Sequence, residues 1–339
     1  MKNGTVTGLL LLTVVSSSGW CHEANRAGQG YHWQKTPSSV ALMADNRVVW
    51  QFNHLGDGKE KGVPYFHPLA TPSGTVLTDR RPADHPWHRG LRFAWKKLNG
   101  LEGYWSWPEG LKRWPENNGM TEVTHVSVET RRDGSAQFEL TLTYHPPHSP
   151  PLLTEHRTIS VAAADEGGTY AIDWKCVFTA GATDVLLDRT PIPGEADGKP
   201  WGGYAGLQFR LAPRNQLAGW SLENARGLRA AHRIGDPRAQ VRNSLLKLHG
   251  EKARWMNVVL ELRGGKRGGV ALLDHPANLR HPTTWHTSSM PNELIQTPLF
   301  EGPHRLSAGK QLILRYRVIV HEGAMTGDEL ERCWKNWTQ

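Results

Sequence analysis

Residues 312–320 read Leu-Ile-Leu-Arg-Tyr-Arg-Val-Ile-Val, and residues 138–144 read Phe-Glu-Leu-Thr-Leu-Thr-Tyr. Apolar side chains stand at every second position of both stretches, and Arg315 and Arg317 fall on the other face of the first one. Successive side chains of a strand point to opposite faces, so this period of two predicts strands that bury one face. These two stretches decide the fold class.

Comparable patterns recur along the chain between turns rich in Gly, Pro and Asn. Further strands are expected at 40–43, 48–52, 123–128, 157–161, 170–178, 207–211, 256–262 and 270–273. No helices alternate with these strands, which excludes a doubly wound α/β fold. The sequence therefore predicts an all-β protein, a large antiparallel β-sandwich of the supersandwich type.

One helix is expected, at the C-terminus. Thr326 and Glu329 have the spacing of a capping box, in which each side chain bonds the backbone N–H of the other residue. Leu330, Trp334 and Trp337 then fall on one helical face. A short helix is therefore expected to pack on the sandwich through this face.

The N-terminus has the three-part pattern of a secretory signal peptide. Lys2 precedes an apolar run at residues 6–15, and the small residues Ser17 and Gly19 suit cleavage before Trp20. We expect a signal peptide at 1–19, an N-terminal segment at 20–34 and a single domain at 35–339, exported to the periplasm or the outside. No other stretch is long enough to span a bilayer, so an integral membrane protein is not expected.

Composition narrows the choice of partner. The net charge is +8 with histidine neutral, but no block of five basic residues occurs, which argues against a nucleic-acid binder. The charge suits an anionic ligand such as an acidic polysaccharide. Cys176 and Cys333 are compatible with a disulfide bridge in an oxidising compartment or with two buried thiols.

The densest group of reactive side chains is Asp84-His85-Pro86-Trp87-His88-Arg89. His85 and His88 suit acid–base chemistry near neutral pH, because imidazole gives or takes a proton there. Asp84 is expected to orient a histidine, and Arg89 to bind a carboxylate or polarise a hydroxyl. The competing interpretation is a structural turn whose side chains bond one another.

A second segment, Asp274-His275-Pro276-Ala277-Asn278, repeats part of this chemistry, so His275 joins the catalytic candidates. Both segments are expected to converge on one concave face, because a site must act on one molecule. Aromatic rings in loops suit stacking on sugar rings. The substrate-binding candidates are His67, Trp87, Trp201, Tyr204, Asn278, Trp285 and His286.

Metal binding is the rival use of the same side chains. His85, His88 and His275 offer nitrogen ligands for zinc, copper or iron. Their spacing matches no established metal motif. The sequence therefore requires no cofactor and leaves a divalent metal open.

The chain resembles the uncharacterised PmoA-like family. The resemblance rests on residues 64–69, 78–91, 200–204, 274–278 and 282–286 and extends over nearly the whole chain after residue 35. It implies an exported protein with a sandwich similar to that of galactose mutarotase and related sugar-active folds. The family label borrows the name of a membrane subunit of methane mono-oxygenase, whose set of membrane spans this sequence lacks.

Three functions remain open at this point. The first is an exported enzyme, a hydrolase, lyase or epimerase, that acts on a carbohydrate or a sugar acid. The second is a non-catalytic glycan-binding module, and the third is a metal-dependent oxidase or oxygenase, as the family label suggests.

The N-terminal pattern makes a direct prediction. Protein purified from its native host should begin near Trp20, because signal peptidase cleaves after the small residues of the pattern. N-terminal sequencing or intact-mass measurement checks this. Soluble protein that retains Met1 in the cytoplasm would contradict it.

Overall fold

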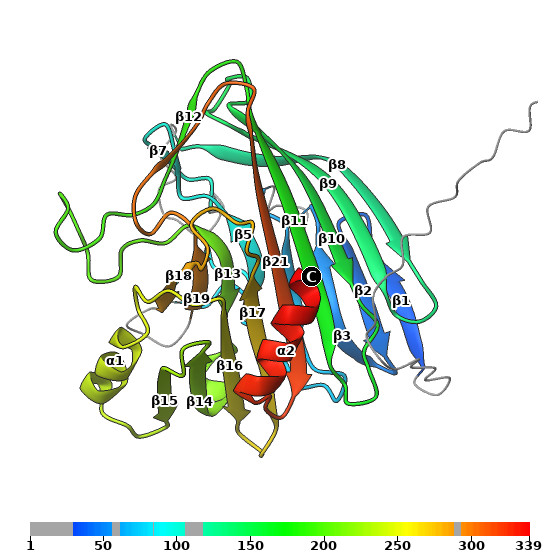
Figure 1. Cartoon of the computed structure of the whole chain (residues 1–339). Helices are drawn as coiled ribbons and strands as arrows, with labels where there is room; N and C mark the ends of the chain where they lie inside the picture. Colours follow the sequence, from blue (N-terminus) through cyan, green and yellow to red (C-terminus); the bar gives the residue numbers. More distant parts are fainter. Residues whose placement is uncertain (1–29, 56–61, 84, 106–117, 288–292) are drawn as a thin grey trace, which may run out of the picture.

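The computed structural model describes residues 30–55, 62–83, 85–105, 118–287 and 293–339. The strands in these ranges form three antiparallel sheets of eight, nine and four strands (Figure 1). The all-β prediction is therefore confirmed. The expected signal peptide and most of the N-terminal segment lie outside the described residues.

The bounds of the elements follow from the backbone pairing. The eight-stranded sheet has the order β1 (Tyr31–Lys35), β2 (Ser39–Ala44), β3 (Arg47–Asn53), β4 (Tyr65–Leu69), β5 (Leu91–Ala94), β13 (Gly206–Arg210), β19 (Glu293–Thr297) and β18 (Thr284–Thr287). The nine-stranded sheet has the order β15 (Arg229–Arg233), β14 (Leu217–Asn224), β16 (Trp255–Leu262), β17 (Arg267–Asp274), β21 (Gln311–Glu322), β11 (Tyr170–Ala180), β10 (Leu153–Val161), β9 (Ala136–His145) and β8 (Met120–Thr130). The small sheet has the order β20 (His304–Leu306), β12 (Val185–Asp188), β6 (Lys97–Leu98) and β7 (Leu101–Glu102). The helical elements are η1 (Arg214–Gln216), α1 (Arg238–Leu246) and α2 (Gly327–Thr338).

The two large sheets share one hydrophobic core. Phe138 of β9 and Leu314 of β21 enter it from the nine-stranded sheet, and Phe93 and Phe209 enter it from the eight-stranded sheet. The alternation seen in the sequence therefore places apolar side chains between the sheets, as a sandwich requires. Arg92, next to Phe93 in β5, and Gln208, next to Phe209 in β13, therefore point away from the core.

The C-terminal helix covers the outer face of the nine-stranded sheet (Figure 1). Leu330 packs there against Leu273 and Ile319, and both halves of the Thr326–Glu329 capping box are present. The prediction of this helix is confirmed. The sequence did not predict α1, whose two buried side chains make only a weak apolar face.

The two cysteines in the described part of the chain are free thiols. Cys176 lies in the core between the sheets, whereas Cys333 on α2 packs on the outer face. A bridge between them is therefore ruled out by their positions. No helix in the described ranges combines the length and apolar composition that crossing a membrane requires.

The core contains one fully buried ion pair. Arg157 Nε donates to Glu155 Oε1 at 2.6 Å, and both side chains are completely buried. Tyr144 Oη donates to the same carboxylate, and the Arg157 guanidinium lies 5.5 Å from the Trp174 ring. Two charges out of water need such partners, because each unpaired one would cost several kcal/mol.

Removal of the buried carboxylate should therefore be costly. We expect Glu155→Gln to lower the free energy of unfolding by about 3–5 kcal/mol, because Arg157 would remain charged and unpaired in the core. The matched control is Asp173→Asn, which breaks a 2.6 Å pair with Arg317 in which the aspartate is 37% exposed. That change should cost less than about 1 kcal/mol. Urea titration of the two variants checks the difference, and equal losses would contradict it.

Candidate functional site

A polar patch lies on the face of the eight-stranded sheet that points away from the core. Leu207 and Phe209 of β13 enter the core, so Gln208 and Arg210 between them point outward. The register places Arg92 of β5 opposite Gln208, and Glu293 of β19 opposite Arg210. We call these four residues, Arg92, Gln208, Arg210 and Glu293, the polar face.

The polar face is covered by the loop that carries the histidine motif. Arg92 Nε donates to Gln208 Oε1 at 2.9 Å, and Arg92 Nη1 donates to the carbonyl of Trp87 at 2.9 Å. Burial, with Arg89 and Arg210 nearby, lowers the pKa of Arg92 to about 9, although Glu293 opposes the shift. Arg92 therefore stays cationic at neutral pH.

His88 lies buried against this face in a fixed tautomer. Arg210 Nη1 lies 3.1 Å from His88 Nδ1. A guanidinium only donates, so Nδ1 is the acceptor and the ring proton sits on Nε2. Burial, followed by the charges of Arg92 and Arg210, holds the pKa of His88 far below its usual range. The ring is neutral and serves as a hydrogen-bonding group rather than as a base.

Glu293 is the acidic member of the site, and the sequence analysis missed it. Its Oε1 lies 3.6 Å from His88 Nδ1, and its side chain is 12% exposed. Burial raises the pKa of Glu293, while the charges of Arg210 and Arg92 oppose the shift. The carboxyl therefore takes up a proton at a higher pH than an ordinary glutamate does.

Aromatic rings border the polar face. The centroids of Trp87 and Trp105 lie 6.0 Å apart, and those of Trp105 and Tyr204 lie 6.1 Å apart. Lys96 places its Nζ 4.5 Å from the Trp105 ring and bonds the carboxylate of Glu102. We call Trp87, Trp105 and Tyr204 the aromatic wall. All three rings are partly exposed, so they remain open to a ligand.

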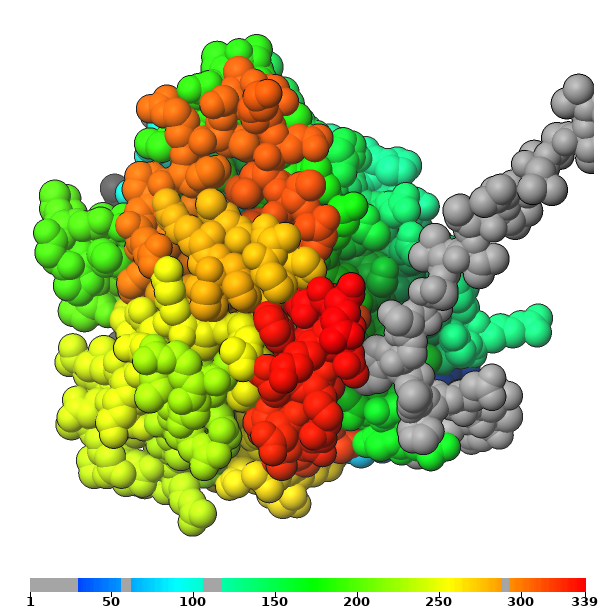
Figure 2. Space-filling model, in the orientation of Figure 1, coloured from blue at the N-terminus to red at the C-terminus, as the bar shows by residue number. Residues whose placement is uncertain are grey.

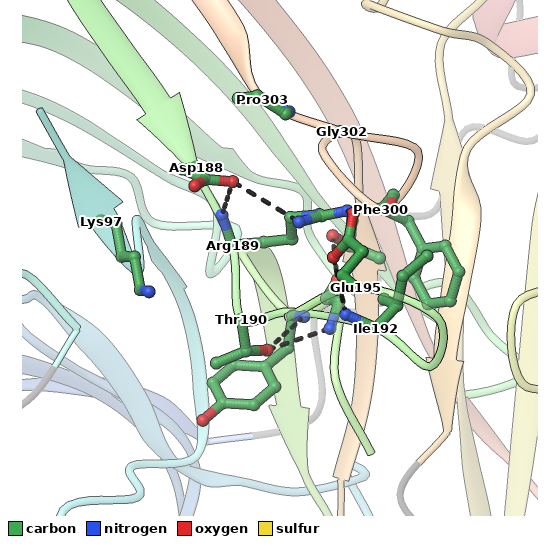
Figure 3. Close-up of polar contacts among 12 residues, drawn as sticks. Lys97, Asp188, Arg189, Thr190, Ile192, Glu195, Phe300, Gly302 and Pro303 are labelled. Carbon is green, nitrogen blue, oxygen red and sulfur yellow. Dashed lines mark hydrogen bonds and ion pairs between the residues drawn. The ribbon is translucent and has the colours of Figure 1, made fainter. Parts of the chain in front are cut away.

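The segment 189–204, which carries Tyr204, is fixed by the contacts shown in Figure 3. Arg189 Nη2 donates to Glu195 Oε1 at 2.6 Å, and its Nε donates to the carbonyl of Phe300 at 3.3 Å. Thr190 Oγ1 accepts from Gly203 N and Tyr204 N at 3.0 and 3.4 Å. Both ends of the segment are thus tied together, and this sets the place of the Tyr204 ring.

His286 and Trp201 join this wall in different ways. His286 Nε2 donates to the carbonyl of Trp201 at 2.9 Å, and its ring lies 5.5 Å from that of Tyr204. Burial, followed by the nearby His249, lowers the pKa of His286 to about 3. His286 therefore supports the wall as a neutral ring, whereas the Trp201 side chain is 51% exposed.

His67 and Arg89 hold the loop in place. His67 Nδ1 lies 2.9 Å from Thr78 Oγ1, and burial, with the charge of Arg89, lowers its pKa to about 4. Arg89 Nη1 donates to the carbonyls of Pro86 and His88 at 2.6 and 3.1 Å. Arg89 is 1% exposed, and its expected role of binding a carboxylate or polarising a hydroxyl stays a prediction.

The loop also needs a glycine directly after Arg89. Gly90 has a φ of +26°, and a Cβ at this position would lie 1.9 Å from the carbonyl oxygen of Phe66. Only a residue without a side chain permits this close approach to β4. The close approach of Gly90 to β4 therefore fixes the end of the loop that carries His85, Trp87 and His88. The rings of His85 and His88 lie 4.7 Å apart.

The second sequence segment does not reach this site, and the expected convergence is wrong. The His275 ring packs 5.2 Å from Trp337 of α2, on the side of the nine-stranded sheet. Asp274 is buried and accepts from Asn278 Nδ2, His281 Nδ1 and Thr283 N at 2.7, 2.7 and 2.9 Å. Asp274 thus organises a turn, and His275 and Asn278 belong to that turn.

Two more sequence candidates lie elsewhere. Trp285 is 0% exposed and donates through Nε1 to the carbonyl of Ala253, because its place in β18 turns it into the core. Asp84 lies outside the described residues. No three or more His, Cys, Asp or Glu side chains within the described ranges are grouped to hold a metal ion.

The family comparison assigns residues 39–335 to a family described as one of unknown function, DUF6807. The chain belongs to the DUF6807 family. The match gives no support to the PmoA-like label suggested by the sequence motifs. No curated protein matches the chain.

Solved structures give partial likenesses to proteins that act on carbohydrates. The galactosidase domain of an alpha-galactosidase-sucrose kinase is 8% identical at a TM-score of 0.38, over 86% of this chain and 40% of that one. A putative mutarotase from Salmonella typhimurium is 11% identical at 0.34, over 87% and 97%. A polysaccharide lyase is 14% identical at 0.27, over 91% and 34%. The chain thus spans less than half the length of two of these proteins.

The Asp274 network yields a prediction that separates turn from site. Asp274→Ala should lower the free energy of unfolding by at least about 2 kcal/mol, because the donors of Asn278, His281 and Thr283 would lose their acceptor. His275→Ala, the neighbouring control, should cost less than about 1 kcal/mol, because its partly exposed ring packs at the surface and makes one exposed hydrogen bond, to Ala277 N. Thermal or chemical unfolding of both variants checks this. A larger loss for His275→Ala than for Asp274→Ala would contradict the assignment.

Proposed function

We propose that this protein binds a sugar acid at the polar face and removes a proton from the carbon next to its carboxylate, with Glu293 as the base. The observation that carries the proposal is Glu293 itself. It is a partly exposed carboxyl whose pKa burial raises, held between Arg92 and Arg210 and beside the neutral His88. A carboxylate with a raised pKa is a stronger base once it is deprotonated.

The two guanidiniums favour one class of chemistry over another. Hydrolysis of a glycosidic bond passes through a cationic, oxocarbenium-like transition state, which Arg92 and Arg210 would disfavour. Removal of a proton next to a carboxylate instead builds negative charge, which preorganised cations stabilise. Proton abstraction is the first step of both epimerisation and elimination, so the proposal covers an epimerase or a lyase.

The remaining groups suit recognition of a sugar. His88 keeps its proton on Nε2, and its lowered pKa leaves the ring a neutral hydrogen-bond donor at neutral pH. The aromatic wall offers partly exposed ring faces, on which the C–H face of a sugar ring stacks. Lys96 adds positive charge behind Trp105 and Tyr204. An anionic, hydroxyl-rich ligand matches all three features, and export of the protein would place it where such polysaccharide fragments occur.

Exchange of substrate hydrogen with solvent tests the proposal directly. Hexuronic and aldonic acids incubated with the protein in D2O should take up deuterium at the carbon next to the carboxylate, as read by NMR. Glu293→Gln should slow the uptake by about 10²–10⁴-fold, the usual contribution of a positioned acid–base group. The control Glu102→Gln removes a carboxylate beside the aromatic wall and should change the rate much less.

The outcomes distinguish the proposal from its rivals. Exchange that survives in Glu293→Gln would overturn the role of this residue. Binding of sugar acids without exchange in the wild type would overturn the enzymatic proposal and identify a glycan-binding module.

The pH dependence provides a separate prediction. The base acts as the carboxylate, so the exchange rate should fall as the pH drops through the pKa of Glu293. Burial raises that pKa, so the fall should occur above the ordinary glutamate value of about 4.3. Arg210→Gln should move the fall to still higher pH, because Arg210 opposes the shift. Rate profiles of the two proteins check this, and a shift in the opposite direction would contradict it.

A further inference from the structure

A pocket lies at the edge of the sandwich, and Trp201 is part of its lining. Its volume is about 490 Å³, within the usual range for small-molecule sites. It is bordered by β14, by β15, by the first turns of α1 and by Trp201 of the 189–204 segment. In Figure 2 that segment (green) lies at the left of the molecule, above the yellow surface to which α1 contributes.

The pocket combines an aromatic floor with a basic rim. Trp220 is 3% exposed and lies 5.8 Å from the His232 ring, and Trp201 and Ile234 are large apolar side chains that stay about half exposed. Arg214, Arg238 and Arg242 contribute positive charge. Arg238 and Arg242 are four residues apart on α1, so they point to the same side of the helix.

The acidic group in the pocket is already engaged. Asp236 Oδ2 accepts from the backbone N–H of Arg233 at 2.7 Å and lies 3.3 Å from His232 Nδ1. One carboxylate faces three guanidiniums among the residues that line the pocket, so the pocket attracts an anion.

From these features we infer that the pocket is a distal subsite for an acidic oligosaccharide whose reacting unit lies at the polar face. This inference rests on the proposed function for the reacting unit. Trp201 connects the two places, since its carbonyl accepts from His286 beside the aromatic wall and its exposed ring lines the pocket. Carboxylates of the outer units pair with Arg238 and Arg242, and a sugar ring stacks on Trp201.

Binding as a function of chain length tests the subsite. The probes are galacturonate and its di-, tri- and tetramer, together with the guluronate series and neutral cellotetraose as the uncharged control. Calorimetry is done with Glu293→Gln, which keeps the pocket intact and prevents turnover. In at least one acidic series the tetramer should bind at least about 10-fold more tightly than the monomer, and cellotetraose should not show this gain.

Two matched double variants test whether the tighter binding of the tetramer comes from this pocket. The double change Arg238→Ala and Arg242→Ala, made in the Glu293→Gln protein, should abolish the advantage of the tetramer and leave monomer binding unchanged. The control is Arg226→Ala and Arg229→Ala, two exposed arginines outside the pocket lining, which should preserve the advantage. Trp201→Ala should weaken tetramer binding in the same way as the α1 double change.

The subsite and the proposed function fail separately. Equal affinity for monomer and tetramer, or a tetramer advantage that survives the α1 double change, overturns the subsite whatever the exchange assay gives. Tight tetramer binding that depends on Arg238 and Arg242, without deuterium exchange by the wild type, supports the subsite and overturns the proton abstraction.

Discussion

The buried guanidiniums of Arg92 and Arg210 impose the constraint on which the site depends. Strand alternation points both side chains away from the sandwich core, yet both are almost completely enclosed. A cation can be enclosed only with hydrogen-bond acceptors and countercharge around it. Gln208 and the carbonyl of Trp87 accept from Arg92, His88 accepts from Arg210, and Glu293 supplies countercharge. These contacts hold the histidine loop on the sheet.

The same constraint explains the state of each titratable group. Positive charge and burial act in the same direction on His88, so the ring stays neutral. They act in opposite directions on Glu293, and burial is the larger influence. His88 is therefore a neutral hydrogen-bonding ring, and Glu293 is a carboxyl with a raised pKa. Shifted pKa values of this kind are typical of catalytic sites.

Much of the fold could be read from the sequence, because burial on one face of a strand leaves a period of two in the chain. Residues 138–144 and 312–320 lie in β9 and β21 as expected, and the capping box marks α2. The short strands of the small sheet leave no such pattern, since β6 and β7 have two residues each. Helix α1 carries too few apolar side chains to be recognised.

The site was only partly predictable, because function here depends on pairing across strands. His85, Trp87 and His88 were found through their clustering, and Tyr204 through its Gly-rich loop. Arg92, Arg210 and Glu293 resemble ordinary polar positions of half-exposed strands, and only the register of β5, β13 and β19 brings them together. The Asp-His-Pro sequence at 274–276 resembles the histidine motif at 84–86, but its residues form a turn on the other sheet. Similarity of short sequence segments does not show which residues lie together, because the site is assembled from strands that are far apart in the sequence.

The division of labour between strands and loops has a consequence for how specificity can diverge. Charge on the polar face comes from central strands, whose neighbours on both sides fix their positions. Ring surfaces come from the loop before Gly90, from Trp105 after β7 and from the segment 189–204, whose ends Arg189 and Thr190 hold in place. Exchange of the 189–204 segment would thus change the ring surface and leave the acceptors of Arg92 and Arg210 in place. The surface that meets a ligand can therefore change at this segment while the charges of the central strands stay the same.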